Sequence, residues 1–132
     1  MVYLEELEIS LTDVNITPES IYEILKNTAK LKNLRQFAFG VSNCDNVKQE
    51  CLLKILDQVA VFPNLRVFLL YACGIKCHSQ ALTSAFESFL ITSQQIKRLL
   101  ASLVSSIREK NGDELEQYLK QKFSRVEIKI IS

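Results

Sequence analysis

Several residue types and segments are scarce in this 132-residue chain, which has three glycines, two prolines, one histidine and no tryptophan. The glycines stand far apart, and neither of the Gly-rich phosphate-binding motifs G-x-G-x-x-G and G-x-x-x-x-G-K occurs. No apolar run approaches the roughly 20 residues that a membrane-spanning helix needs. The first ten residues lack the basic segment of a secretion signal. These absences predict a cytoplasmic protein with no membrane partner and no bound cofactor.

Neither sign of charge dominates, because 16 Lys and Arg residues face 15 Asp and Glu residues for a net charge of +1. A dedicated nucleic-acid-binding domain normally has a clear basic excess, so no nucleic-acid partner is expected. Without a secretion signal, the four cysteines are expected to be reduced thiols. With 48% apolar residues, the chain is long enough to bury one core without disulfides or a metal, and residues 1–132 are expected to form a single domain or a segment of a longer repeat domain.

A repeat of about 30 residues is the main positive signal in the sequence. Residues 34–39 resemble residues 65–70, and similar apolar patterns begin at Leu4, Ile96 and Val126. Successive starting points lie 30 or 31 residues apart. The repeat predicts four units over approximately 4–33, 34–64, 65–95 and 96–125, with a final strand over 126–131.

Within each unit the hydrophobic period changes from about 2 to about 3.6, which indicates a strand followed by a helix. Thr17 and Pro18 suit the start of the first helix. Asp45 or Asn46, Ser79 and Asp113 are the corresponding candidates for the caps of the later helices. Strands repeated with one helix between them predict an α/β fold with parallel strands and right-handed crossovers.

The third unit has the most specific pattern. Residues 65–75 read L-x-x-L-x-L-x-x-C-x-L with ordinary apolar substitutions, and an Ala- and Leu-containing helical segment continues to residue 90. This stretch resembles the leucine-rich repeats of the ribonuclease-inhibitor-like family; the match is weaker in residues 4–34, 34–64 and 96–126. The resemblance implies a short right-handed solenoid with outer helices, in which Cys73 bonds to the backbone of its turn.

Two alternatives to a regular solenoid remain open in the sequence. In the fourth unit Ile96 and Leu99 keep the pattern, but polar Ser105 and Ser106 follow, so that a helix from Thr92 to Arg108 also fits. For the whole chain, the alternative is a compact doubly wound parallel sheet, covered by helices on both faces. That fold would bury adjacent strand residues such as Leu69 and Leu70 alike.

One cluster, Cys73, Cys77 and His78, with Cys44 as a further candidate, invites a metal hypothesis. Its C-x-x-x-C-H spacing matches no zinc finger or ribbon, so we expect no metal site. A cysteine and a histidine adjacent in sequence are also poorly placed as nucleophile and base, so we expect no catalytic site and no enzyme. In the leucine-rich-repeat interpretation Cys73 belongs to the turn, and Cys77 and His78 begin the next helix.

In that interpretation, strand residues between the inward leucines form columns on the concave face. One column is Glu5, Arg35, Arg66 and Lys97, a basic strip that fits an acidic partner. The second column is Glu8, Ala38, Leu69 and Leu100, and the third is Ser10, Gly40, Tyr71 and Ser102. Leu69, Tyr71 and Leu100 would form an exposed apolar patch with an aromatic residue in it, as is typical of binding hot spots. The residues expected to bind a partner are Arg35, Arg66, Leu69, Tyr71, Lys97 and Leu100.

The sequence therefore predicts a protein–protein interaction module or scaffold that binds another protein on its strand-lined face. The end units of a solenoid leave an apolar face open, so neighbouring chains are candidates to cover the two ends. The alternative is a small parallel α/β enzyme or nucleotide-binding domain, with its site at the strand ends around residues 40–44 and 71–77.

Overall fold

The computed structural model describes residues 4–12, 15–104, 106–107 and 112–132 of the chain. Strands and helices alternate without exception along the described chain, which confirms the α/β class. The elements are β1 (Glu6–Ser10), α1 (Pro18–Thr28), β2 (Gln36–Gly40), α2 (Gln49–Val59), β3 (Val67–Tyr71), α3 (Ser79–Thr92), β4 (Arg98–Ser102), α4 (Gly112–Lys122) and β5 (Glu127–Ile131).

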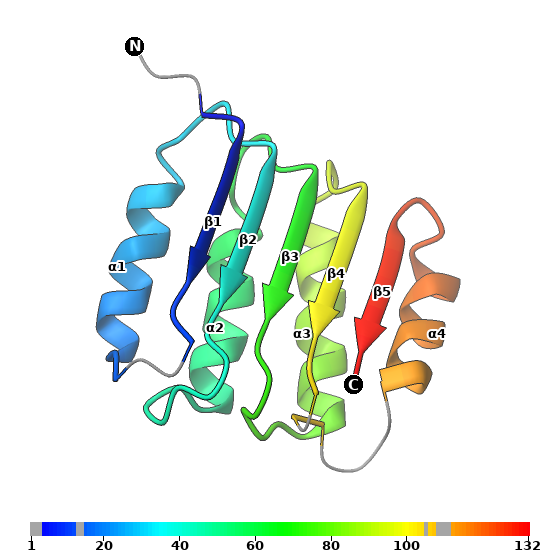
Figure 1. The fold of residues 1–132 in the computed structure, drawn as a ribbon. Helices are drawn as coiled ribbons and strands as arrows, with labels where there is room; N and C mark the ends of the chain where they lie inside the picture. The colour runs from blue at the N-terminus through cyan, green and yellow to red at the C-terminus, as the bar shows by residue number, and fades with distance from the viewer. Residues whose placement is uncertain (1–3, 13–14, 105, 108–111) are drawn as a thin grey trace.

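The five strands form one parallel sheet whose order, β1-β2-β3-β4-β5, is the order of the sequence (Figure 1). Each strand begins 29 to 31 residues after the preceding one. The register follows the repeat, since Phe37 pairs with Phe68 and Phe68 with Leu99. One unit of the sequence repeat is therefore one strand with the helix that leads to the next strand.

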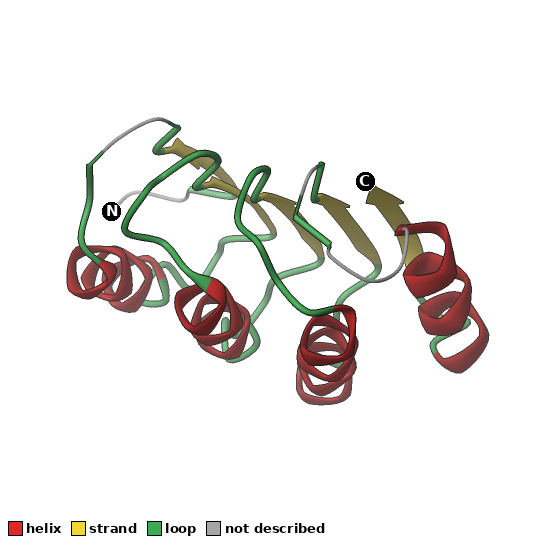
Figure 2. Ribbon diagram, turned by 90° about the horizontal axis from the view of Figure 1, so that it is seen from below, coloured by secondary structure: helices red, strands yellow, loops and turns green. Residues whose placement is uncertain are grey.

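All four helices lie on the same side of the sheet, and none of the described helices covers the other side (Figure 2). The doubly wound alternative is therefore wrong. A doubly wound fold places helices on both faces because its strand order reverses at a switch point. Here the order never reverses, so successive crossovers of similar length return on one side. No described helix has the combination of length and apolar character that a bilayer crossing requires.

The core lies between the sheet and the helices and is rich in phenylalanine. Phe37, Phe39 and Phe68 come from the strands and Phe89 from α3, and each is at most 1% exposed. The rings of Phe37 and Phe68 lie 6.1 Å apart and join neighbouring units, and those of Phe68 and Phe89 lie 5.5 Å apart and join the strand and helix of one unit. The buried helix faces complete the layer; they include Ile21, Leu25, Leu52, Ile55, Leu56, Leu82, Phe86, Leu115 and Leu119.

The uncertain fourth unit contains a strand. The helical alternative over Thr92–Arg108 is wrong, because α3 ends at Thr92 and β4 occupies Arg98–Ser102. The apolar side chains on the inner face of this segment decide the outcome: Ile96 and Leu99 are 1% and 0% exposed. Burial against α3 therefore outweighs the polar residues that follow the strand.

Only one of the expected helix caps is confirmed. The backbone N–H of Ser20 donates to the Thr17 side chain at 3.2 Å, as expected for an N-cap. The caps expected for α2 and α3 are wrong, since Lys48 and His78 hold those positions without a side-chain cap bond. Asp113 is the second residue of α4. Polar groups near α2 instead join neighbouring units: Asn46 Nδ2 donates to Asn15 Oδ1 at 2.6 Å.

Hydrogen bonds from serine side chains hold the turns that follow the strands. Ser42 Oγ accepts from the backbone N–H of Cys73 at 3.1 Å. Ser106 Oγ accepts from Ile75 N at 3.1 Å and donates to the carbonyl of Ala72 at 2.6 Å. Buried backbone groups need such partners, so the two serines act in the turns beside Cys73, whose thiol lies 3.6 Å from the Ser102 carbonyl oxygen.

At the outer edge of β5, a carboxylate of α4 takes the place of a further strand. Figure 1 shows α4 beside β5, and Glu116 Oε1 accepts from the outward backbone N–H of Ile130 at 2.6 Å. This bond holds the pKa of the Glu116 carboxyl below its ordinary value, and Lys120, 3.1 Å from Glu116 Oε2, adds to the effect. Glu116 therefore satisfies a backbone donor that the sheet leaves without a partner strand.

We expect Glu116→Gln to lower the free energy of unfolding by about 1 kcal/mol at neutral pH, because a charge-assisted bond is lost. A lowered pKa in the folded state means that the contribution is complete above the ordinary carboxyl pKa of 4.5 and is lost as the pH falls through the lowered value. Urea denaturation between pH 2 and 7 measures both effects. Equal pH profiles for the variant and the unaltered chain would contradict this role.

Candidate partner-binding face

The side of the sheet that faces away from the helices is the candidate site, and we call it the open face. Alternate strand residues point toward it, and the register places them in three rows across the five strands. The rows are Glu6, Gln36, Val67, Arg98 and Glu127; Glu8, Ala38, Leu69, Leu100 and Lys129; and Ser10, Gly40, Tyr71, Ser102 and Ile131.

The centre of the open face is apolar. Val67, Leu69, Tyr71 and Leu100 are half-buried although no described helix covers them, and Leu69 pairs with Leu100 on the adjacent strand. Their chain neighbours Phe68 and Leu70 point the other way and are 0% exposed. A patch of this kind, surrounded by polar and charged side chains, is typical of a protein interaction surface.

A row of three cations, which we call the basic row, borders the apolar centre at the edge where the strands begin. Arg35, Arg66 and Lys97 each immediately precede a strand, and all three are exposed. Their backbones are stacked: Arg66 N donates to Arg35 O, and Lys97 N donates to Arg66 O, both at 2.7 Å. Within the described chain, no ion pair involves any of the three. Like charges on adjacent strands repel, so the row lowers stability slightly.

Charge is distributed unevenly across the face. The β1 side is acidic, with Glu5, Glu6 and Glu8 exposed, whereas Arg98 and Lys129 lie on the opposite side. Arg98 Nε is 3.3 Å from a Glu127 oxygen, but these side chains are 60% and 72% exposed, so the pair contributes little to stability. The open face is therefore acidic on β1 and uncharged on β2 and β3, with the basic row along the edge where β2, β3 and β4 begin.

Of the sequence-predicted residues, the structure brings Leu69, Tyr71 and Leu100 together on the open face and places Arg35, Arg66 and Lys97 at its border, directly before the strands. Leu69 pairs with Leu100, and Tyr71 lies two residues further along β3. Sequence reasoning missed Val67 and Arg98, which occupy the first row, while Arg66 and Lys97 lie one residue before the strands. The L-x-x-L spacing leaves two residues between the buried ones and does not indicate which of them, for example Arg66 or Val67, faces the open side of the sheet. The strict alternation of side chains begins only inside the strand.

A hollow of 510 Å³ lies at the strand ends, where the alternative function would place its site. It lies between the loops that follow β2 and β3, and Asn43 and Gly74 line it. Gly74 has φ of +80°, and a Cβ there would meet the Asn43 side chain, so glycine is required for this turn. The backbone N–H of His78 donates to Gln49 Oε1 at 2.7 Å, which closes one side of the hollow.

None of the four cysteines forms a disulfide. Cys73 Sγ lies 3.4 Å from Ser102 Oγ, so this thiol joins the turn after β3 to the end of β4. Cys77 and His78 do not begin the helix as expected, because α3 starts at Ser79 and the buried Cys77 forms an isolated bridge with Ile107. Desolvation raises the pKa of the buried Cys51 thiol, which favours its protonated, unreactive form. No three Cys, His, Asp or Glu side chains in the described ranges are grouped as metal ligands.

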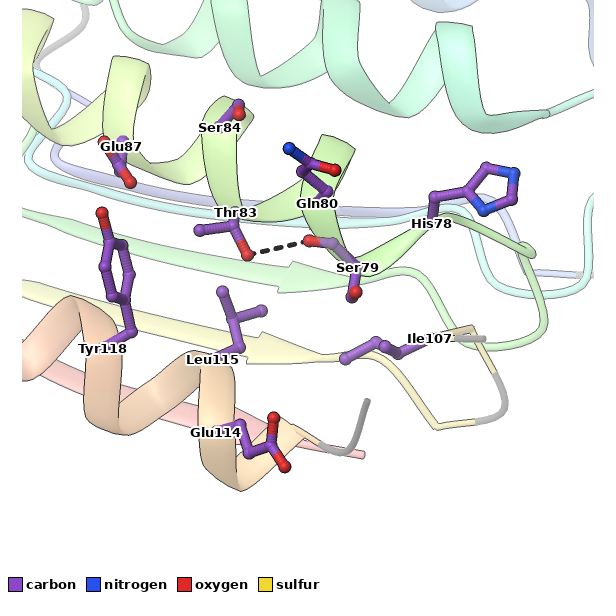
Figure 3. A pocket seen from close by; sticks show the side chains of 10 residues that line it. All are labelled: His78, Ser79, Gln80, Thr83, Ser84, Glu87, Ile107, Glu114, Leu115 and Tyr118. Atoms are coloured by element: carbon purple, nitrogen blue, oxygen red, sulfur yellow. Dashed lines mark hydrogen bonds between the residues drawn. The ribbon is translucent and has the colours of Figure 1, made fainter. Parts of the chain in front are cut away.

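A second groove, of 910 Å³, separates α3 from α4 on the helix side (Figure 3). The Tyr118 hydroxyl points toward Glu87, and Lys122 Nζ lies 2.8 Å from a Glu87 oxygen. Both contacts hold the pKa of the Glu87 carboxyl below its ordinary value. The charge of Glu87 is thus neutralised within the chain, unlike the charges of the basic row.

Comparison with known proteins gives no family for this chain. No family model matches the sequence, and no curated protein gives a significant match.

Proposed function

We propose that the protein is an interaction module that binds another protein on the open face of its sheet. The observation that carries this proposal is the apolar patch of Val67, Leu69, Tyr71 and Leu100, which no described helix covers. Soluble chains seldom leave adjacent apolar side chains on an uncovered sheet without a partner. No cofactor, metal or catalytic group has a part in this proposal.

We also propose that the fold is a short leucine-rich-repeat solenoid. Three observations support it: one strand and one helix in each repeat of about 30 residues, helices on one side only, and polar bonds that join successive turns. In such a solenoid the sheet side is the binding surface and the helix side faces solvent. The exposed outer edge of β1 is where a neighbouring chain would cover the end of the array. The lack of any disulfide among the four cysteines supports a reducing compartment, the cytoplasm.

Site-specific photo-crosslinking tests the proposed function. A photoreactive phenylalanine analogue would replace Leu69 or Leu100, and the chain would be irradiated in an extract of its own cells. We expect both positions to give the same adduct, of one defined mass, because they lie side by side on the open face.

Gln117 is the matched control, because it is exposed on α4, on the helix side of the molecule. The analogue at Gln117 is expected to give no adduct of that mass, and adding Arg66→Glu to the Leu69 variant is expected to remove its adduct. Adducts at Gln117 but not at Leu69, or adducts at none of the positions, would refute the proposal.

A small-molecule or nucleotide site at the strand ends is the second candidate, which the 510 Å³ hollow between the loops after β2 and β3 favours. Titration of the isotope-labelled chain with ATP, followed by amide NMR, separates the two candidates. Saturable shifts at Asn43, Gly74 and Gln49 would support the second candidate. Their absence, together with crosslinks from Leu69, is the result that the interaction module predicts.

A further inference from the structure

We infer that the partner segment that lies on the open face is an acidic amphipathic helix, running across the strands over β2–β4. This inference depends on the proposed function and specifies its ligand. Its first basis is the basic row, in which Arg35, Arg66 and Lys97 have no ion-pair partner within the described chain. Because the net charge of the chain is only +1, three adjacent unpaired cations are a local feature and not a reflection of composition. Carboxylates on a partner would relieve their repulsion.

The spacing of the basic row matches the pitch of a helix. Residues at equivalent positions of adjacent strands lie about 4.8 Å apart, and a helix rises about 5.4 Å per turn. Over the two steps from Arg35 to Lys97 the mismatch is therefore only about 1.2 Å, which long flexible side chains can absorb. An extended segment presents same-side residues about 6.7 Å apart, and its mismatch over two steps is about 4 Å. Acidic residues at one-turn intervals on a helix are the better match.

The position of the apolar patch agrees with the same orientation. Leu69 lies three residues beyond Arg66 along the chain, a distance of about 10 Å in extended backbone. This distance equals the diameter of a helix with its side chains. A helix laid across the strands would therefore place apolar residues on Val67, Leu69 and Leu100 while its acidic flank lies above the basic row. The Tyr71 side chain would border the opposite flank.

The acidic residues of β1 limit how far the row of acidic residues on the partner helix can extend. Glu5 precedes β1 at the position equivalent to Arg35, and Arg35 N donates to Glu5 O at 2.8 Å. A partner carboxylate one turn beyond Arg35 would thus meet an acidic side chain. We expect the partner helix to carry acidic residues over β2, β3 and β4 and a neutral or basic residue over β1.

A nucleic acid fits the same surface less well. Single strands are held by bases that stack on aromatic side chains beside a basic groove. Tyr71 is the only aromatic residue in the three rows of the open face, and the centre is otherwise aliphatic. Aliphatic side chains suit leucine or methionine on a partner helix better than they suit bases.

The test uses two stapled helical peptides of about 18 residues, long enough to span the sheet. Both carry leucines along one face; the first has glutamates at successive turns along one flank, and the second has lysines there. Fluorescence anisotropy with the whole chain at low salt is expected to show the acidic peptide binding at least about tenfold more tightly. Reversing the row with Arg35→Glu, Arg66→Glu and Lys97→Glu is expected to reverse the preference. Circular dichroism verifies that this variant is folded, and Arg66→Glu alone is expected to reduce the preference if the triple variant does not fold.

Several results would overturn the inference. They are equal or tighter binding of the basic peptide, a preference that survives the charge reversal, and no binding of either peptide at about 1 mM. Tighter binding of a 20-nucleotide single strand that depends on Arg66 would assign the row to nucleic acid instead. The proposed function fails separately: crosslinks from Leu69 to a segment that is not an acidic helix would refute this inference alone, and the absence of crosslinks would refute the function itself.

Discussion

Replacing Phe68 with alanine is expected to lower the free energy of unfolding by about 3–5 kcal/mol. Phe68 lies on the central strand, is 0% exposed, and contacts the rings of Phe37 and Phe89. The substitution would leave a cavity where β2, β3 and α3 meet, and a close-packed core relaxes only partly into such a space. Urea denaturation followed by circular dichroism measures the loss.

Phe123 is the matched control for Phe68. It is only partly buried, after the end of α4, and makes no ring contact with the aromatic cluster. Phe123→Ala is therefore expected to be less destabilising than Phe68→Ala. Equal losses for the two substitutions would show that the phenylalanine cluster does not join the units as we describe.

The second large effect is expected at Ser106. This side chain is 0% exposed and bonds both to the Ile75 N–H and to the Ala72 carbonyl. Ser106→Ala would leave two buried backbone groups without partners, which we expect to lower the free energy of unfolding by about 2–4 kcal/mol. Ser42 accepts a single bond, from Cys73, so Ser42→Ala is expected to lower it by about 1 kcal/mol.

The control for both serines is Ser88, which is exposed on α3. Ser88→Ala is expected to change the free energy of unfolding by less than about 0.5 kcal/mol. If Ser106→Ala were as mild as Ser88→Ala, the turns would be held by contacts other than these serine bonds.

The order and register of the strands were predictable because the repeat consists of apolar residues at the same positions in successive units. Leu34, Phe37 and Phe39 recur as Leu65, Phe68 and Leu70, and burial on the helix side requires the same spacing in every unit. That burial also fixed the fourth strand, which the sequence left open to a helix. The position of the helices on one side followed once the strand order was known, and the sequence alone left it undecided.

Other features depend on contacts that no local pattern encodes. Ser106 hydrogen-bonds to two backbone groups of the preceding unit, and Glu116 accepts a hydrogen bond from the edge of the following strand. A single serine or glutamate gives no sign of such partners. The caps expected for α2 and α3 failed for a related reason, since nearby polar groups such as Asn46 and Gln49 bond to neighbouring units.

The candidate site was predictable in part. Leu69, Tyr71 and Leu100 were identified from the alternation of strand residues, and the register places them together. Val67 and Arg98 were not identified. Each is one of two residues between buried apolar residues, and which of the two faces the open side depends on where the regular strand begins. The isolation of the basic row from any counterion also required the structure, since Glu5 and Glu6 are near it in the repeat.

One side of the sheet is open, and substitutions at two adjacent residues of β3 test this directly. Leu69 points to the open face and Leu70 to the core. We expect Leu70→Arg to lower the free energy of unfolding by more than about 4 kcal/mol, because it buries an unpaired charge, and Leu69→Arg to change it by less than about 1 kcal/mol. Comparable destabilisation by the two substitutions would mean that both faces of the sheet are covered, and would contradict the account.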